Sequence, residues 1–460
     1  MTRRAVLAAP GARAASGYLR AVPDASDSRA LEAARRLCRE VGARIGARLS
    51  VELWDGSVVP LGADVHPTLR IRIAGPGVLG TLLRRPTLEN LLRQYATGQL
   101  DVRGGDPFAL WEVLREKRAR TGYRALRKRE LIGAALPFLF VPRPKRVPTP
   151  SYAGDETGAS KRDEGDFIRF HYDLGNDFYA LFLDPHMQYT CAYFPSWDAS
   201  LETAQEAKLE MICRKLQLQP GDRFLDIGCG WGGLLCYAAK RYGVVAHGVT
   251  LSPEQASFAR ARAAEQGLAD RVTIELRSYA DLDMEFDKIS SIGMAEAVGV
   301  ANLPAYFAKV RSLLRDRGLF LNHAITRRAK RRRRAFARLR PEQHLLQKYI
   351  FPGGELDDLG HSVALMEAHG FEVHDVEGWR DHYARTTRLW SQRLAAQEER
   401  AVALVGRERF RIWVAYLAGV SFALGDGSAR IYQTLASRHR AKGPSGMPPT
   451  RAGLYAERTP

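Results

Sequence analysis

The segment from Arg223 to Leu235, RFLDIGCGWGGLL, constrains the fold of this 460-residue chain more than any other. It predicts a buried strand that ends in an acidic residue, then a glycine-rich turn and the first turn of a helix. Glycine has no β-carbon and tolerates positive φ, so a flat polar ligand can lie close to this backbone. The spacing differs from the dinucleotide pattern G-x-G-x-x-G, and no G-K-[ST] follows, so a phosphate cradle is not expected. The turn contains Asp226, Gly228, Gly230, Gly232 and Gly233.

Strand and helix signals alternate regularly from Asp222 onward. This alternation predicts an α/β fold with a mostly parallel, doubly wound sheet. We expect helices to begin at Trp231, Pro253 and Pro304, and residues 380–440 to be largely helical. The expected strands are 223–228, 244–250, 272–278, 286–293, 319–326 and 371–379.

A small N-terminal α+β domain is predicted for residues 29–118. Apolar residues recur at helical spacing over 29–47, and Asp55-Gly56 is a strong hairpin signal. Residues 1–28, rich in Ala, Arg and Gly, are expected to be disordered. We expect a linker over 119–165, the larger domain over 166–440 and a tail over 441–460.

The composition is that of an ordinary enzyme with an excess of basic residues. Lys and Arg number 69 against 51 Asp and Glu, a net charge of +18 that favours an anionic partner. No apolar run is long enough to cross a bilayer, and the first residues are a poor match to a signal peptide. The cysteines form no C-x-x-C pair, so neither a metal site nor a disulfide framework is expected. We therefore expect a cytoplasmic protein.

Polar and aromatic residues follow consecutive strands, where a doubly wound sheet binds its ligands. Each residue alone is more often a helix cap, a turn or a core residue than part of a site. Their recurrence at successive strand ends favours a binding site, in which the ring of Tyr279 could stack on an adenine. In chain order these residues are Asp226, Thr250, Leu251, Gln255, Tyr279, Glu296 and His323.

Five stretches carry a resemblance to a known family. HYDLGNDFYALFLDPHMQYTCAYF, AKLEMICRKLQLQPGDRFLDIGCGWGGL, VTLSPEQ, YIFPGGEL and HYARTTRLW together closely resemble cyclopropane-fatty-acyl-phospholipid synthases. Mycolic acid cyclopropane synthases look like more distant relatives. The resemblance runs from about Phe167 to Tyr432 and, more weakly, into residues 60–110. It implies a Rossmann-like S-adenosylmethionine (SAM) methyltransferase fold with a seven-stranded, mostly parallel sheet and helical insertions.

The resemblance also implies a reaction and its participants. The family uses SAM to add a methylene group across a cis double bond of a phospholipid acyl chain. The alkene attacks the sulfonium methyl, and a base, thought to be a bound bicarbonate ion, removes a proton as the ring closes. The groups that hold this ion correspond to the backbones of Cys191 and Ile325 and the side chains of Glu296, His323 and Tyr383. The SAM contacts correspond to Tyr189, Thr190, Asp226, Gly228, Gly230, Thr250, Leu251, Gln255 and Tyr279.

The chain departs from the family pattern near these positions. Ala297 stands where many relatives have His, and Ala295 replaces a common Phe, which puts the acyl specificity in doubt. Val420 occupies the position of a cysteine once proposed as catalytic, and Ala280 lacks a polar side chain that some relatives use near the adenine. Cys191 has no evident base in the sequence, so we expect its backbone, not a nucleophilic thiol, to act.

Two segments suggest contact with an anionic membrane. The apolar run Leu131–Val141 lies between basic clusters and is either an interfacial segment or a helix docked on the larger domain. Arg327–Arg340 holds nine basic residues in fourteen. A solvated helix face is the plainest explanation of this run, and no nucleic-acid-binding motif accompanies it. A phospholipid substrate favours peripheral docking on the inner face of the membrane.

Several alternatives remain open at this point. Loss of the proton elsewhere would give a methylene or methyl branch in place of the ring. N-methylation of a small amine and a non-catalytic lipid- or SAM-binding module are more distant options. The sequence is compatible with a homodimer.

Overall fold

The computed structural model describes residues 25–116, 128–142, 144, 149–152, 164–330, 338–439 and 443–456. The chain divides into two compact units that do not follow the order of the sequence. The smaller unit contains residues 1–84, 102–104 and 111–144, and the larger contains 85–101, 105–110 and 145–460. The domain limits near residues 118 and 165 therefore stay predictions.

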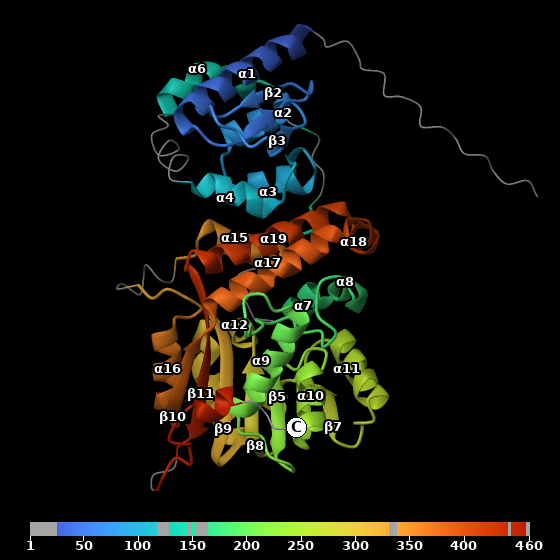
Figure 1. The fold of residues 1–460 in the computed structure, drawn as a ribbon, viewed down its shortest axis with the longest axis vertical. Helices are drawn as coiled ribbons and strands as arrows, with labels where there is room; N and C mark the ends of the chain where they lie inside the picture. The colour runs from blue at the N-terminus through green and yellow to red at the C-terminus, as the bar shows by residue number, and fades with distance from the viewer. Residues whose placement is uncertain are drawn as a thin grey trace, which may run out of the picture. The chain divides into compact units, whose positions relative to one another are not determined.

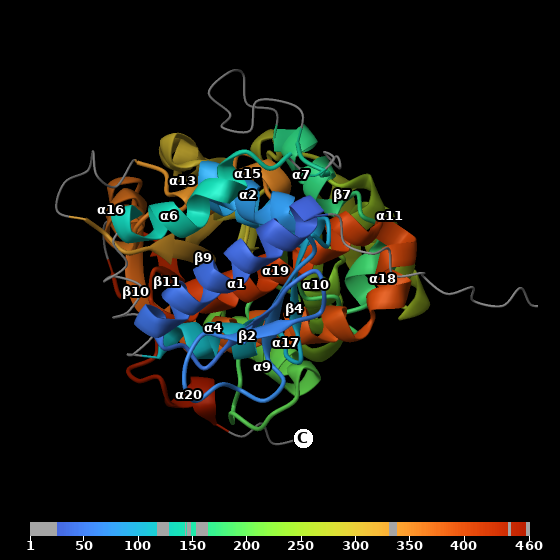
Figure 2. The same ribbon diagram turned by 90° about the horizontal axis from the view of Figure 1, so that it is seen from above.

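The smaller unit combines helices with most of a four-stranded sheet. Helices α1 (Ala25–Ile45), α2 (Pro76–Arg84) and α6 (Lys128–Leu139) contact one another, and Figure 2 shows α1 and α6 side by side. The sheet has the order β2-β1-β3-β4. Its strands are β1 (Ser50–Glu52), β2 (Val58–Pro60), β3 (Arg70–Ile73) and β4 (Leu100–Arg103).

The predicted hairpin is confirmed, because β1 and β2 pair antiparallel around Asp55-Gly56. Gly56 has a φ of 85°, a conformation that suits glycine, and the Asp55 carboxylate accepts from the Ser57 amide. The predicted start of the first helix is wrong by four residues. Helix α1 begins at Ala25, while residues 1–24 of the predicted disordered segment lie outside the described residues.

The larger unit is built on the predicted α/β sheet, in the order β10-β11-β9-β8-β5-β6-β7 (Figure 1). Neighbours from β9 to β7 pair in parallel, whereas β11 pairs antiparallel with both β9 and β10. The seven-stranded, mostly parallel sheet is thus confirmed. Its strands are β5 (Arg223–Ile227), β6 (Val245–Thr250), β7 (Val272–Leu276), β8 (Phe286–Ile292), β9 (Leu314–Arg327), β10 (Phe371–Gly378) and β11 (Ala429–Arg438).

The prediction that residues 380–440 are largely helical is wrong for its last part. Helices α17 (Arg380–Ala396), α18 (Glu398–Val405) and α19 (Arg407–Gly425) fill most of the segment, but β11 follows them. A turn with Gly427 at a φ of 72° ends α19. The residues after it insert between β9 and β10, where pairing on both sides outweighs the weak local signal.

Helices cover both faces of the sheet because successive side chains of each strand point to opposite faces. Phe224 packs in the core formed with α9 (Leu201–Lys215), α10 (Gly233–Tyr242) and α11 (Pro253–Glu265). Its neighbour Leu225 packs in the core formed with α13 (Leu303–Leu313) and α16 (Leu359–Ala368). The result is the three-layer arrangement of a doubly wound fold.

A third core lies among the helical insertions. These are α7 (Glu164–Tyr172), α8 (Asn176–Ala180), α15 (Pro341–Tyr349), α17, α18 and α19, with α3 (Leu88–Ala96) packed on α19. The His171 ring stacks on those of Tyr189 and Trp413, and its Nδ1 donates to the Ile350 carbonyl at 2.8 Å. Burial lowers the pKa of His171 to about 4, so this imidazole is neutral.

The remaining short elements complete the described parts of the chain. Helix α4 (Pro107–Arg115) has residues in both units. The others are α12 (Ala295–Val298), α20 (Ala452–Tyr455), η1 (Tyr279–Asp281) and η2 (Val300–Asn302). Within the described ranges, no helix combines the length and the apolar character needed to cross a membrane.

A substitution in β6 tests how tightly the sheet packs on the glycine turn. A β-carbon at Gly248 would lie 2.3 Å from Leu235 Cδ1 and 2.8 Å from Cys229 Sγ. We expect Gly248→Ala to lower the free energy of unfolding by about 1–3 kcal/mol. Gly419→Ala on α19 is the matched control, since its β-carbon meets nothing within 4 Å. It should be neutral or stabilise by up to about 1 kcal/mol. Equal effects in urea denaturation would contradict this packing.

Candidate functional site

The glycine turn after β5 adopts a backbone that side chains would obstruct. Gly228, Gly230 and Gly232 have φ values of 77°, 53° and 74°. A β-carbon at Gly228 would lie 2.9 Å from Met294 Cγ. A β-carbon at Gly230 would meet only Gln255 Nε2, at 4.0 Å, so it would occupy the pocket itself. The turn is therefore shaped for close approach of a ligand to the main chain.

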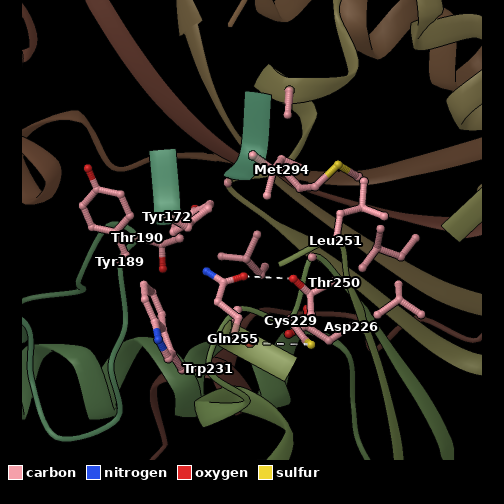
Figure 3. Close-up of a pocket in the computed structure, with 18 of the residues that line it drawn as sticks. Tyr172, Tyr189, Thr190, Asp226, Cys229, Trp231, Thr250, Leu251, Gln255 and Met294 are labelled. Carbon is pink, nitrogen blue, oxygen red and sulfur yellow. Dashed lines mark hydrogen bonds between the residues drawn. The ribbon is translucent and has the colours of Figure 1, made fainter. Parts of the chain in front are cut away.

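A pocket opens beside this turn, at the carboxyl ends of β5, β6 and β7. All nine residues predicted to contact SAM line it. Figure 3 shows the rings of Tyr172, Tyr189 and Trp231 on one side, opposite Thr250 and Leu251. The nine predicted residues are Tyr189, Thr190, Asp226, Gly228, Gly230, Thr250, Leu251, Gln255 and Tyr279.

Polar groups are fixed at precise points of the pocket. Ser290 Oγ donates to Asp226 Oδ1 at 2.6 Å, and burial raises the pKa of Asp226 to about 7. Thr250 Oγ1 donates to Gln255 Oε1 at 2.9 Å, as Figure 3 shows. Such a pocket can accept an amine or hydroxyl group at Asp226 and hold apolar or aromatic surface elsewhere.

Tyr279 is held where an aromatic ligand face can meet it. It lies on the 3₁₀ helix η1, and Ser278 caps that turn by accepting from the Ala280 amide. The Tyr279 ring packs edge-on against Tyr306, with centroids 5.4 Å apart. Ala280 is exposed and does not line the pocket.

The sequence did not single out several lining residues. Trp231 lies inside the glycine-rich segment, and Tyr172 is the second residue of the stretch HYDLGNDFYALFLDPHMQYTCAYF. Their positions in these segments could therefore have marked them as candidates. Trp231 Nε1 donates to Asn176 Oδ1 at 2.7 Å, which fixes its ring. Phe351 lies in YIFPGGEL, another stretch that carries the resemblance, whereas Met294 comes from a loop outside these stretches. The further lining residues include Tyr172, Trp231, Ser278, Met294, Ala297 and Phe351.

Helix α9 fixes the loop that supplies Tyr189, Thr190 and Cys191. Gln205 Nε2 donates to the carbonyls of Gln188 and Thr190. Lys208 is 1% exposed, and its ammonium donates to Gln188 Oε1 and, at 2.9 Å, to Thr190 Oγ1. Burial lowers the pKa of Lys208 to about 8, opposed by the nearby carboxyl groups of Asp184 and Asp226. The buried ammonium thus holds the loop in place and interacts electrostatically with the pocket residue Asp226.

The predicted catalytic residues do not line this pocket, but form a buried cluster beside it. Glu296 Oε1 accepts from the Ile325 amide at 2.5 Å, while its Oε2 is buried without a partner. Burial raises the pKa of Glu296 to about 7. His323 Nδ1 lies 3.1 Å from Gln433 Nε2. Because the Gln433 amide donates to Nδ1, the His323 proton lies on Nε2, which is also buried without a partner.

Trp379 links the other members of the cluster. The His323 ring meets Trp379 edge-on, 5.2 Å between centroids, and burial lowers the pKa of His323 well below its usual value. The Tyr383 amide donates to the Trp379 carbonyl. Burial and the nearby Tyr416, Cys191 and Glu296 raise the pKa of the Tyr383 phenol well above its usual value. The site therefore presents a neutral imidazole and a protonated phenol.

Cys191 is unsuited to nucleophilic chemistry. Burial raises the pKa of its thiol well above the usual value, and Sγ donates to the Ala192 carbonyl at 3.2 Å. Val420, at the position of the once-proposed cysteine, packs partly buried against the same aromatic core. Ala297 lines the pocket, so the absent imidazole leaves room there.

The comparisons with known proteins agree on one family. The family described as mycolic acid cyclopropane synthetase matches residues 159–434. A probable fatty acid methyltransferase of Pseudomonas putida is 37% identical over 412 residues, which cover 88% of this chain and 96% of that protein. The cyclopropane-fatty-acyl-phospholipid synthase of Escherichia coli strain K12 is 43% identical over 270 residues, 58% of this chain and 66% of that protein.

A solved structure shares the fold of the larger part of the chain. A mycolic acid cyclopropane synthase complexed with SAH and CTAB is 34% identical, with a TM-score of 0.56. The match covers 60% of this chain and 99% of that one.

The buried ammonium of Lys208 gives a direct test of how the pocket is held together. Lys208→Met leaves Gln188 Oε1 and Thr190 Oγ1 without their donor, so we expect the free energy of unfolding to fall by about 1–3 kcal/mol. Affinity for SAM, measured by calorimetry, should fall with it. Lys240→Met, on the exposed side of α10, is the control and should change neither. If both variants behave alike, Lys208 does not organise the pocket.

Proposed function

The chain belongs to the mycolic acid cyclopropane synthetase family and is a SAM-dependent methyltransferase, and on this premise we propose a specific reaction. The enzyme adds a methylene group to the cis double bond of an unsaturated phospholipid acyl chain and forms a cyclopropane fatty acid. The similarity to a cyclopropane-fatty-acyl-phospholipid synthase supports this choice of substrate.

One observation carries the proposal: two buried polar atoms of the cluster lack a partner. His323 Nε2 offers a proton donor, and Glu296 Oε2 offers an acceptor, or a donor when protonated. Unpaired buried polar atoms are costly, so each is expected to bind a ligand, and we propose that one bound anion satisfies both. The surrounding apolar core, which includes Trp379, Trp390 and other aromatic side chains, excludes water.

SAM fits the pocket beside the cluster and supplies an electrophilic sulfonium methyl group when bound. Asp226 accepts from the amino or hydroxyl groups of the ligand, and Tyr279 offers a ring to a flat base. The glycine turn admits the ligand to the main chain. Trp231 and Tyr189 exclude water from the reacting end, so close alignment can supply much of the acceleration of a weak alkene nucleophile.

We include bicarbonate as the base, held by the catalytic cluster. The ion accepts a hydrogen bond from His323 Nε2 and from the Tyr383 phenol, and exchanges one with Glu296. The backbone amides of Cys191 and Ile325 are the remaining donors to the ion. In the structure, the Ile325 amide donates to Glu296 Oε1. A small anion in this dry setting stabilises developing positive charge and can accept a proton.

A second candidate is methyl or methylene branching of a fatty acyl chain. The relative of comparable length is named a probable fatty acid methyltransferase, which favours it. Both reactions begin with attack of the alkene on the methyl group, which leaves a cation on the neighbouring carbon. In ring formation the methyl group loses a proton as it bonds to that carbon. A methylene branch requires a hydride shift to that carbon before the methyl group loses its proton, and a methyl branch also requires a reductant. Proton NMR of the purified lipid separates them, because ring protons resonate apart from those of a branch.

Expression in a host with cis-unsaturated phospholipids tests the reaction. We expect acyl chains heavier by one methylene group and the NMR signals of a cyclopropane ring. Glu296→Gln, which keeps the shape but cannot ionise, should lower the rate by roughly 10²–10⁴-fold while SAM still binds. Lipids with unchanged masses beside folded, SAM-binding protein would refute the proposal. A Glu296→Gln variant as active as the wild type would remove Glu296 from it.

We further propose that the protein docks peripherally on an anionic membrane through the end of α6. Leu136, Leu139 and Phe140 are 49%, 39% and 82% exposed, and basic residues flank this apolar run in the sequence. Exposed apolar groups beside cationic ones suit an anionic lipid interface. In the basic run Arg327–Arg340, residues 328–330 are exposed and residues 331–337 lie outside the described residues.

Phe140→Ser tests this docking. Losing the burial of one aromatic side chain in lipid should weaken binding to phosphatidylglycerol-containing vesicles by about tenfold. Leu404→Ser is the matched control, since Leu404 on α18 is 48% exposed and belongs to the larger unit, whereas α6 belongs to the smaller one. Co-sedimentation at physiological salt measures both. Equal binding by the two variants would contradict docking through the end of α6.

A further inference from the structure

A second, small cavity lies at Glu296, separate from the cofactor pocket. Its volume is about 20 Å³, enough for one water molecule. Its walls are formed by residues from α12, η2, α13, β9, α16 and the segment between α15 and α16. The polar residues that line it are Glu296, Asn322, Thr326, Glu355, Asp357 and Ser362.

Three buried side chains on this cavity have a polar atom without a partner. They are Glu296 Oε2, Asn322 Oδ1 and Thr326 Oγ1, in residues that expose 8%, 5% and 4% of their surface. A polar cavity with several unsatisfied groups is where a buried water is expected, because such a water makes about three hydrogen bonds. The walls therefore suit a hydrogen-bonded water in contact with Glu296, whose Oε2 has lone pairs for this water as well as for the proposed anion.

The far wall of the cavity leads to a carboxylate and an imidazole. Asp357, 7% exposed, lies within 2.8 Å of His361 Nδ1 and accepts from Ser362 Oγ at 2.8 Å. The His361 side chain is 22% exposed, so it reaches solvent. Main-chain bonds fix this wall: the Glu355 amide donates to the Glu296 carbonyl, and the Arg327 amide to that of Asp357.

The proposed reaction needs such a connection. When the ring closes, a C–H bond of the transferred methyl group breaks, and its electron pair forms the new C–C bond. The proton passes to a base in the site. SAM loses its positive charge as the methyl group leaves, so each turnover releases one proton. A site closed by aromatic side chains gives that proton no direct way to bulk water.

We propose that this cavity is the exit route for the proton: Glu296 transfers it through a cavity water to Asp357, and His361 transfers it to solvent. This inference rests on the proposed function and adds a route to it. Burial places the pKa of Glu296 near 7, so this carboxyl can both take up and release a proton near neutral pH. The other charged groups at the route are Glu355, Asp358 and Arg327. Asp358 Oδ1 accepts from the His361 amide, and Arg327 Nε donates to the Leu356 carbonyl.

Variants of the outer end test the route with purified protein and vesicles of unsaturated phospholipid. His361→Ala should lower kcat by about tenfold or more and leave the KM for SAM unchanged, because His361 touches neither substrate. Imidazole added to the buffer should restore kcat, and the solvent deuterium isotope effect should increase. Asp357→Asn should show the same loss without rescue by imidazole.

His369→Ala is the matched control, because His369 lies just after the end of the same helix and does not line the cavity. In the described structure its Nδ1 bonds only to the Leu365 carbonyl. It should leave kcat and the isotope effect unchanged. A His361→Ala enzyme with wild-type kcat, or with a loss that imidazole does not restore, overturns the route. If the wild-type enzyme forms cyclopropane rings while His361→Ala gives either of these results, only the route has failed. An inactive wild type removes the proposed function together with it.

Discussion

The whole site depends on holding a carboxyl and an imidazole where water is excluded. Moving such groups out of water is costly unless hydrogen bonds compensate. In the fold, Glu296 Oε1 accepts from the Ile325 amide, and His323 Nδ1 accepts from the Gln433 side chain. Glu296 Oε2 and His323 Nε2 are left for a ligand. Burial also keeps His323 neutral and raises the pKa of Glu296. The reactivity of the site therefore follows from its burial.

The sheet and its coverings impose this burial. The parallel strands bring the glycine turn, Asp226 and Thr250 to one edge, and β11 inserts beside β9 so that Gln433 meets His323. The helical insertions then close the edge with aromatic rings. Helix α9 holds the loop of Thr190 and Cys191 through Lys208, so the pocket and the cluster share one support.

The sequence predicted those parts that local patterns determine. Strand ends and glycine spacing are local, so the sheet and the nine pocket residues followed from them and from the family resemblance. Strand β11 was missed because its stability comes from pairing on both edges, which residues 429–438 do not encode locally. Lys208 looks like an ordinary residue of an amphipathic helix, and only the tertiary structure buries it. Asp357 lines the same cavity as Glu296 although the two are far apart in the chain, a proximity that no pattern in one sequence predicts.

The central claim is that the buried cluster removes a proton from the methyl group that SAM delivers. Turnover with SAM carrying a fully deuterated methyl group tests it most directly, with the product acyl chains analysed by mass spectrometry. The account predicts cyclopropane chains that have lost one deuterium atom of the transferred methyl group to solvent. Products that retain every deuterium atom would show that no proton leaves that group, and would contradict the account.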